Sequence, residues 1–575
     1  MKKIFAPLIH ELPFFFIICI LLFEGTIASR IYLTFSSFIQ SFATVFIYSY
    51  SATMIVYFSK SKTIKFTFYL IAYVLCLIDL YLHIQFGTRI SPNIILLLSE
   101  TNSHESTEFI QTYLLSSRIL IFIAVFLMCI GATYILEKRK RFFLLFRKSG
   151  ILIILVLLFL TFGTYCTSMH YYRLFKCQDT MEVDVWMKKY EMRAMDNLSN
   201  LTYSLYDMFL MRKEQEKALF YALNDIDGTI INQDSINIIF VIGESHNKWH
   251  SSLYGYSLNT NPLLTEEFTK GRLFLFRDAT APYNLTSNVL RSLFNTNCLG
   301  MNEKWLNGVF FPAIFHHAGF EVDFWDNQYD PTSRNSFDFS LNSYIHNPTI
   351  ESTVYSKSNK KSFNLDEKLL QDYFSIKSNK YSHNLIMFHL MGQHFAYYTR
   401  FPHGIGFDHF TSDSIIRKDK RLTNKMKQVI ADYDNATRYN DYILFSIIEH
   451  YKDTNCAVIY LSDHGEDVFD YQNEIGRCLE KEVSVPVMHH QFNIPFFVWC
   501  SDIYQEKHKD IIDNLKTALP KPFSSDNICH LLFHLAGIKT KYYTPERDII
   551  GPTYKCPIRL INDVIDYDRA LKKKP

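Results

Sequence analysis

Five apolar segments in the first 170 residues constrain the fold of this chain more than any other feature. The segments cover residues 9–29, 38–58, 65–86, 117–136 and 150–169. Each is about as long as the ~20 residues that an α-helix needs to cross the hydrocarbon core of a bilayer. The first could be a signal peptide, but it contains Glu11 and Glu24, lacks a small-residue cleavage pattern and is followed by further apolar segments. We therefore expect a transmembrane domain of five helices over residues 1–170.

The charges between these segments predict their orientation. Basic residues precede the first segment and lie between the second and third and between the fourth and fifth, whereas the intervening loops are poor in lysine and arginine. These basic residues are Lys2, Lys3, Lys60, Lys62, Lys65, Lys138, Arg139, Lys140, Arg141, Arg147 and Lys148. Basic loops stay on the cytoplasmic side of a membrane. The amino terminus is thus predicted to lie inside, and everything after residue 170 in the periplasm, anchored to a bacterial inner membrane.

The segment that follows the last span is amphipathic. Residues 178–234 combine charges with Met, Leu, Tyr and Trp186 at helical spacing. We expect helices that lie on the membrane surface, so residues 171–234 are assigned to a linker and residues 235–575 to a soluble domain. The net charge of +2 gives no indication that the chain binds nucleic acid.

Three apolar runs in the soluble part end in polar residues that carry chemistry. They are SINIIFVIGES (235–245), NLIMFHLMGQH (384–394) and NCAVIYLSDHGE (455–466). Each run predicts a buried strand, and helical stretches lie between them. This alternation predicts an α/β sandwich with a mostly parallel sheet. In such folds the site lies beyond the carboxyl ends of the strands, where we expect Glu244, His394 and the pair Asp463–His464 to converge.

Glu244, Asp463 and His464 are candidate ligands of one metal ion. Zinc takes about four ligands, here from histidine nitrogen and carboxylate oxygen, and a sharp turn through Gly465 would let the adjacent Asp463 and His464 reach the same ion. The alternative is that Asp463 caps a helix and His464 lies at the surface. Thiolate zinc chemistry is not expected, because none of the 11 cysteines stands in a CxxC motif.

A reactive hydroxyl is expected between Arg277 and Phe294, where the chain reads RDATAPYNLTSNVLRSLF. Thr280, Thr286 and Ser287 are the candidate nucleophiles. Metal coordination lowers the pKa of a hydroxyl enough for it to attack phosphorus. Threonines before a helix are more often only N-caps.

Histidines are plentiful in the soluble part, and some are expected to stabilise charge on phosphoryl oxygens or to protonate a leaving group. They include His246, His250, His389, His394, His489 and His490. Because a lone histidine is more often structural, the residues alone assign none of them individually.

These stretches resemble the lipid-dependent phosphoethanolamine transferases, a lipopolysaccharide-modifying family that includes the transferable colistin-resistance enzymes. The resemblance covers most of the chain. It is carried by GESHNKWHSSLYGYSLNTNPLL (243–264), YLSDHGED (460–467), YDNATRYNDYIL (433–444) and FHLMGQHFAYYTRFP (388–402). The LYGY form, with His250 before it, is closer to the branch that acts on core sugar than to the lipid A branch. The resemblance implies a sulfatase- or alkaline-phosphatase-like periplasmic domain.

The resemblance also implies roles for particular residues. Glu244, Asp463 and His464 fall on the zinc ligands of the family, and Thr286 falls on its nucleophile, which also binds the metal. His394 falls on a histidine that contacts the phosphoryl group or a second metal.

Two further implied roles concern substrates. His490, with His489 as its rival, falls on another functional histidine. ETNSHE (100–105) resembles the segment that contacts the lipid donor, which suggests Thr101 and Glu105 as donor contacts.

The implied activity is a zinc-dependent transfer of phosphoethanolamine from phosphatidylethanolamine to a lipopolysaccharide acceptor, either a lipid A phosphate or a core sugar, through a phospho-threonine intermediate. One alternative is a phosphoglycerol transferase on the same scaffold. A sulfatase would need Cys or Ser in a C-x-P-x-R setting, and the nearest string is CPIR at 556–559, with the wrong spacing. A non-catalytic membrane sensor or scaffold is the last alternative. The acceptor, the number of zinc ions, the disulfide pairing and the oligomeric state stay open.

Overall fold

The computed structural model describes residues 2–572 except for 29–34, 87, 101–116, 139–149, 190–194, 232–233, 302–306, 330–341, 377–382, 418 and 479–482. The chain divides into two compact units, Met1–Glu214 and Gln215–Pro575. Thr101 and Glu105, the expected donor contacts, lie outside the described residues.

The first unit is helical. Its helices are α1 (Lys2–His10), α2 (Leu12–Ala28), α3 (Phe35–Ser59), α4 (Lys62–Phe86), α5 (Pro92–Glu100), α7 (Ser117–Lys138), α8 (Gly150–Lys176), α9 (Thr180–Lys189) and α10 (Asn197–Ala222), the last of which continues into the second unit. In the described part of the chain, three helices are long and apolar enough to cross a membrane: Phe35–Ser59, Lys62–Phe86 and Ile153–Lys176.

The predicted count of five spans is therefore not reached in the described residues. The first predicted span is broken at Glu11, and its apolar part forms α2, which is shorter than the others. The fourth predicted span coincides with α7, although part of the side chains of α7 lie outside the described residues. Helices thus occupy all five predicted segments, and within the described residues three of them meet the length and composition of a full crossing.

Aromatic side chains join the apolar helices to one another. Phe15 of α2 meets Phe46 of α3 edge to face at 5.1 Å, and Phe14 meets Tyr69 of α4 in the same way at 4.9 Å. Such edge-to-face pairs are favoured by the quadrupoles of the rings. They provide close packing in a bilayer, where apolar surface alone does not drive helices together.

The second unit is built on an eight-stranded sheet with the order β11-β3-β10-β7-β2-β6-β4-β5. The strands are β2 (Ile236–Gly243), β3 (Leu273–Thr280), β4 (Glu321–Asp326), β5 (Lys357–Ser358), β6 (His383–His389), β7 (Cys456–Ser462), β10 (Asn493–Cys500) and β11 (Pro522–Ser524). Every neighbouring pair is parallel except the two pairs that β10 makes with β3 and β7. The predicted α/β fold with a mostly parallel sheet is confirmed.

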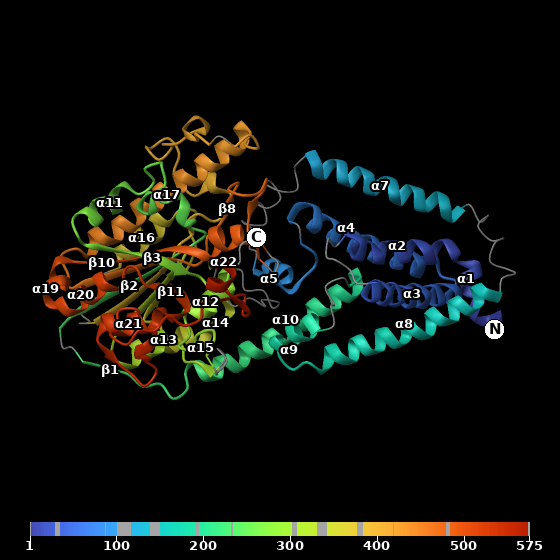
Figure 1. Cartoon of the computed structure of the whole chain (residues 1–575), viewed down its shortest axis with the longest axis horizontal. Coiled ribbons are helices and arrows are strands. Elements are labelled where there is room, and N and C mark those ends of the chain that lie inside the picture. The colour runs from blue at the N-terminus through green and yellow to red at the C-terminus, as the bar shows by residue number, and fades with distance from the viewer. Residues whose placement is uncertain are drawn as a thin grey trace. The chain divides into compact units, whose positions relative to one another are not determined.

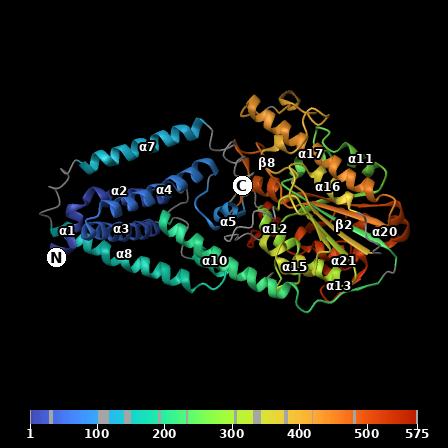
Figure 2. The same cartoon turned by 180° about the vertical axis from the view of Figure 1, so that it is seen from behind.

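Helices cover both faces of this sheet. Figures 1 and 2 show α11, α16 and α17 on one face and α13 and α21 on the other. The main helices of this unit are α11 (Pro262–Thr269), α12 (Thr286–Leu293), α13 (Phe311–His317), α15 (Pro348–Thr353), α16 (Asp366–Ser375), α17 (Asn424–Tyr451), α19 (Asp502–Lys507), α20 (Lys509–Ala518) and α21 (Ile528–Ala536). Side chains of β2 alternate between two cores: Phe240 packs with one and Val241 with the other. A strand buried on both faces has the continuous apolar pattern that β2 shows.

The register of the central strands decides where the polar residues meet. β2 pairs in parallel with β7, and Gly243 lies opposite Ser462. The next residues on the two strands, Glu244 and Asp463, therefore leave the sheet side by side, and the amide of Asp463 donates to the carbonyl of Gly243 at 2.9 Å. This edge, at the carboxyl ends of the parallel strands, is where α/β sheets place their sites.

Candidate metal centre

Glu244, Asp463 and His464 form a cluster that could hold a metal ion. One ligand atom from each lies within 4.8 Å of the other two, and all three side chains are buried. Glu244 follows β2, and Asp463 and His464 follow β7. Carboxylate oxygens and an imidazole nitrogen are ligands that zinc and related divalent metals accept.

Hydrogen bonds hold one oxygen of Asp463, and its other oxygen lies close to the ring of His464. Asp463 Oδ1 accepts from the amides of Ser245 at 3.0 Å and His464 at 2.6 Å. Asp463 Oδ2 is buried without a hydrogen-bond partner in the described structure, and it lies 3.1 Å from His464 Nε2. A buried carboxylate oxygen without a partner is costly, and a divalent cation at this point would satisfy it. The residues therefore fit a metal ion.

The second ring nitrogen of His464 supports the same interpretation. His464 Nδ1 lies 2.8 Å from the carbonyl of Gly465. A carbonyl only accepts, so Nδ1 carries a proton, and Nε2 is the nitrogen that faces Glu244 and Asp463. Backbone carbonyls commonly orient metal-binding histidines in this way.

Thr286 is the first residue of α12 and lies against the cluster. Its Oγ1 donates to Glu244 Oε2 at 3.0 Å and lies 3.3 Å from His464 Nε2. Thr280 instead ends β3 and donates to the carbonyl of Phe523 at 3.2 Å. The amino terminus of a helix also carries partial positive charge. The structure thus brings together all four residues predicted to hold the metal.

Arg477 also reaches this cluster, although the sequence pattern gave no sign of it. Its Nη1 lies 2.8 Å from His464 Nε2 and 3.5 Å from Thr286 Oγ1. Burial opposes its charge, but the carboxylates of Glu466 and Glu244 outweigh this and raise the pKa of Arg477. The residue lies in the segment between DHGE and His490, which has no periodic pattern to indicate a role.

Gln328 and His389 extend the polar network from Glu244. Gln328 Nε2 lies 3.0 Å from Glu244 Oε2 and 3.0 Å from His389 Nε2. His389 Nδ1 lies 2.9 Å from one oxygen of Asp326, and His346 Nε2 lies 2.9 Å from the other. Burial lowers the pKa of His389, but Asp326 outweighs burial and raises it to about 9. The sequence named His389 only as one histidine among several and missed Gln328.

His394 lies in a segment that packs against Glu244. The amide of Gln393 donates to the carbonyl of Glu244 at 3.0 Å. Burial lowers the pKa of His394 to about 3, so its imidazole is neutral at pH 7. Its Nδ1 is buried without a hydrogen-bond partner among the described residues. The role that the resemblance implies for His394 stays a prediction.

His490 and His489 point into different surroundings. His490 Nδ1 lies 3.3 Å from Asn247 Nδ2 and 3.5 Å from Asp470 Oδ2, and burial lowers its pKa to about 4. The ring of His489 stacks on Trp249 at 4.1 Å. In the described contacts the side chain of neither histidine touches the metal cluster, and the catalytic role expected of His490 stays a prediction.

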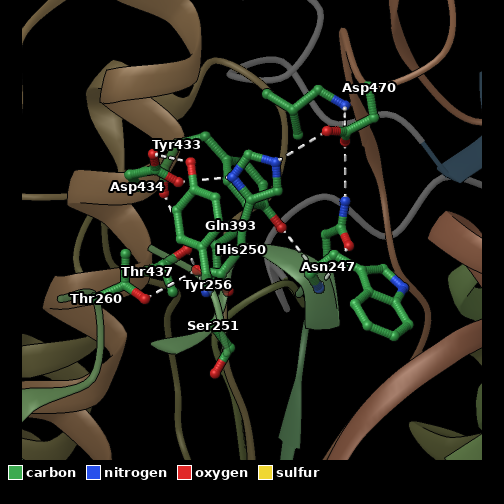
Figure 3. Close-up of polar contacts among 12 residues, drawn as sticks. Asn247, His250, Ser251, Tyr256, Thr260, Gln393, Tyr433, Asp434, Thr437 and Asp470 are labelled. Carbon is green, nitrogen blue, oxygen red and sulfur yellow. Dashed lines mark hydrogen bonds and ion pairs between the residues drawn. The ribbon is translucent and has the colours of Figure 1, made fainter. Parts of the chain in front are cut away.

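A second group of buried charged residues is centred on His250 (Figure 3). His250 Nδ1 lies 2.7 Å from Asp434 Oδ1 of α17, and Nε2 lies 3.4 Å from Asp470 Oδ1. Arg417 Nη2 also contacts Asp470 Oδ1, at 2.8 Å. Asn247 donates to the carbonyl of Glu466 at 2.9 Å and to Asp470 Oδ2 at 3.2 Å. The cluster thus ties the loops that follow β2 and β7 to each other and to α17.

The sulfatase family model matches residues 236–538, more than half of the chain. The chain belongs to the sulfatase family. This membership covers the domain that carries the metal cluster, and the predicted sulfatase-like domain is confirmed.

Phosphoethanolamine transferase EptC of Escherichia coli K12 is similar to this chain, 24% identical over 84% of this chain and 83% of its own. Kdo(2)-lipid A phosphoethanolamine 7''-transferase of the same strain is 28% identical over 48% of this chain and 46% of its own. The resemblance to the phosphoethanolamine transferases is confirmed.

Solved structures agree with this fold. The periplasmic domain of E. coli EptC, also solved in complex with zinc, has a TM-score of 0.51 at 25% identity over 59% of this chain and 95% of its own. The integral membrane protein EptA of Neisseria meningitidis has a TM-score of 0.60 at 15% identity over 96% of this chain and 98% of its own. These matches confirm the predicted organisation, a membrane-embedded amino-terminal part followed by a periplasmic sulfatase-like domain.

Substituting Gly465 with alanine is expected to disturb the metal ligands. A Cβ at Gly465 would lie 2.1 Å from the carbonyl oxygen of His490, a backbone atom that cannot move aside alone. The turn that carries His464 must therefore shift, and a shift of about 1 Å can cost on the order of 10²-fold in activity. We expect a clear loss of bound metal, measured by elemental analysis of the purified full-length protein. Gly131→Ala is the control, since its Cβ would meet nothing within 4 Å; equal metal contents would contradict the prediction.

His250 is expected to make stability depend on pH. Burial alone lowers its pKa, but Asp434 and Asp470 outweigh burial and raise it from 6.5 to about 9. The stabilisation is therefore complete below about pH 6.5 and is lost as the pH rises through about 9. Removing one partner of a buried ion pair costs about 3 kcal/mol, so His250→Gln should lower the unfolding temperature of the full-length protein at pH 6 to 7.

The difference between the wild type and His250→Gln should shrink above about pH 9. His403→Gln is the control, because His403 forms an exposed pair with Asp408, and exposed pairs contribute little. Thermal unfolding in detergent across this pH range measures both variants. A deficit that stayed constant with pH would show that the charge of His250 is not the cause.

Proposed function

We propose that this protein transfers phosphoethanolamine from phosphatidylethanolamine to a lipopolysaccharide acceptor through a covalent intermediate on Thr286. The observation that carries the proposal is the contact of Thr286 Oγ1 with both Glu244 and His464, at 3.0 and 3.3 Å, inside a buried set of metal-type ligands. The relatives with this fold that are named for their activity include phosphoethanolamine transferases. Their activity supports the same reaction here.

Zinc is the metal proposed for Glu244, Asp463, His464 and Thr286. The donor set suits it, and the zinc complex of the EptC periplasmic domain supports the choice. When bound, zinc supplies a Lewis acid that lowers the pKa of a coordinated hydroxyl and neutralises charge on phosphoryl oxygens.

The residues of the chain supply the first displacement. Thr286 Oγ1, positioned by its hydrogen bond to Glu244 Oε2, gives up its proton and forms a bond to the phosphorus of the lipid headgroup. The bond from phosphorus to the diacylglycerol oxygen breaks, and diacylglycerol leaves as an alcohol after taking up a proton. The position of Thr286 at the start of α12 directs backbone amides toward the phosphoryl group.

In the second displacement an acceptor oxygen attacks the phosphorus and loses its proton, the bond to Thr286 Oγ1 breaks, and Thr286 regains a proton as its hydroxyl re-forms. His394 is the group proposed to take the acceptor proton, and its Nδ1 is buried without a hydrogen-bond partner among the described residues. His490 is the second proposed proton-transfer group. The acceptor is a lipid A phosphate or a core sugar.

The remaining proposals concern the whole chain. Residues 1–170 would anchor the enzyme, residues 171–234 would form the amphipathic linker, and residues 235–575 would form the catalytic domain. Thr101 and Glu105 would contact the lipid donor. Both substrates carry lipid chains, which gives the membrane anchor its purpose: it keeps the catalytic domain at the surface where they lie.

Mass spectrometry of the full-length protein after incubation with phosphatidylethanolamine tests the proposal. We expect a phosphoethanolamine adduct on Thr286 that Thr286→Ala abolishes and that the neighbouring control Ser287→Ala retains. An adduct on Thr280 or Ser287 would contradict the assignment of Thr286 as the nucleophile but would still support phosphoethanolamine transfer. A glycerophosphate adduct formed only from phosphatidylglycerol would identify a phosphoglycerol transferase. A metal-loaded protein that forms no adduct with either lipid would support a non-catalytic scaffold.

A further inference from the structure

A short β-hairpin places Arg477 next to the metal ligands. β8 (Asp467–Val468) begins three residues after His464 and pairs antiparallel with β9 (Ile475–Gly476). Arg477 follows β9 directly, and its guanidinium ends 2.8 Å from His464 Nε2 and 3.5 Å from Thr286 Oγ1. A permanently charged group from outside the predicted site thus reaches the atom on which the intermediate would form.

The backbone beside Arg477 is fixed without help from its own side chain. Asn284 Nδ2, two residues before Thr286, donates to the carbonyl of Cys478 at 2.7 Å and to Gln491 Oε1 at 2.8 Å. Gln491 Oε1 also accepts from the amide of Cys478 at 2.9 Å. This clamp joins the loop of Arg477 to the loop of Thr286. Hydrogen bonds other than those of the guanidinium thus hold the loop of Arg477 beside that of Thr286.

The carboxyl groups of the site can balance two cations, a metal ion and the guanidinium of Arg477. Glu244, Asp463 and Glu466 are buried carboxyl groups around Arg477, and their charges favour its guanidinium. In the described residues only one group of side chains, the set at Glu244, could hold a metal ion. A phosphoryl group in transfer spreads negative charge over several oxygens. One metal and one guanidinium would share that charge.

Metal binding and Arg477 cannot both use the lone pair of His464 Nε2. If His464 Nε2 held a metal, Arg477 Nη1 would keep its other contact, Thr286 Oγ1 at 3.5 Å. A phosphorus bonded to that oxygen presents its non-bridging oxygens one bond further out. Guanidinium groups bind such oxygens through two parallel hydrogen bonds.

We propose that Arg477 is a further catalytic residue, whose guanidinium binds the non-bridging oxygens of the phosphoryl group during its transfer to and from Thr286. The inference rests on the proposed function. Arg477 gains no bond in either displacement and loses no proton; it stabilises charge that is larger in the transition state than in the substrate.

The test compares Arg477→Gln and Arg477→Lys in the full-length protein with phosphatidylethanolamine as substrate. Removing one group that stabilises transition-state charge costs about 10²–10³-fold in kcat. We expect this loss in the rate of adduct formation on Thr286 for Arg477→Gln, with metal content and KM close to the wild type. Arg477→Lys keeps a positive charge but lacks the planar pair of donors, so its rate of adduct formation should lie between those of the wild type and Arg477→Gln. Arg421→Gln, which removes an exposed arginine paired with Asp419, is the control.

A third variant separates catalysis from structure. Arg477→Ala should regain part of its rate when guanidinium ion is added at millimolar concentration. The proposal would be overturned if Arg477→Gln formed the adduct at the wild-type rate. It would also be overturned if Arg477→Ala lost its metal and added guanidinium ion did not restore the metal content. If the wild type itself forms no adduct on Thr286, the proposed function fails first, and the two failures are thereby distinguished.

Discussion

The parallel pairing of β2 with β7 is the constraint on which the site depends. Their register places Gly243 opposite Ser462, so Glu244 and Asp463 leave the sheet at the same edge. A shift by one residue would turn every side chain of β2 to the other face, exchanging Phe240 and Val241 between the two cores. The same apolar packing that stabilises the sheet therefore also determines the spacing of the metal ligands.

Burial of so many charged groups requires that each has partners. The metal cluster, the pair of Asp326 with His389 and the cluster around His250 lie at or beyond the carboxyl ends of the parallel strands. Each carboxylate in these groups contacts a cationic side chain, the candidate metal site or backbone amides, as expected for charges removed from water. Arg477 completes this balance at Thr286, where a phosphoryl group would add further negative charge.

Strand positions could be predicted because an unbroken apolar run of about four to six residues is the pattern of a strand buried on both faces. That pattern located β2, β6 and β7 and the polar residues at their ends. It could not choose among Thr280, Thr286 and Ser287, because a hydroxyl before a helix has the same pattern whether it caps or reacts. The resemblance to a known family favoured Thr286, and the structure places that residue beside Glu244. Length and polarity also made the amino-terminal helices predictable, although Glu11 interrupts the first of them.

Arg477, Gln328 and the partners of His250 could not be predicted. Arg477, Gln328, Arg417 and Asp470 come from loops, which have no period that indicates what a side chain faces. Asp434 lies on α17, and the helical pattern does not identify the partner of a polar residue. The sequence by itself determined the membrane anchor, the mostly parallel sheet and the ligand-type residues at its edge, because hydrophobic burial acts on local patterns that can be read along the chain. Only the tertiary structure decided which hydroxyl meets the ligands and which cation faces it, because contacts between residues 40 to 200 positions apart depend on strand order and on how loops pack.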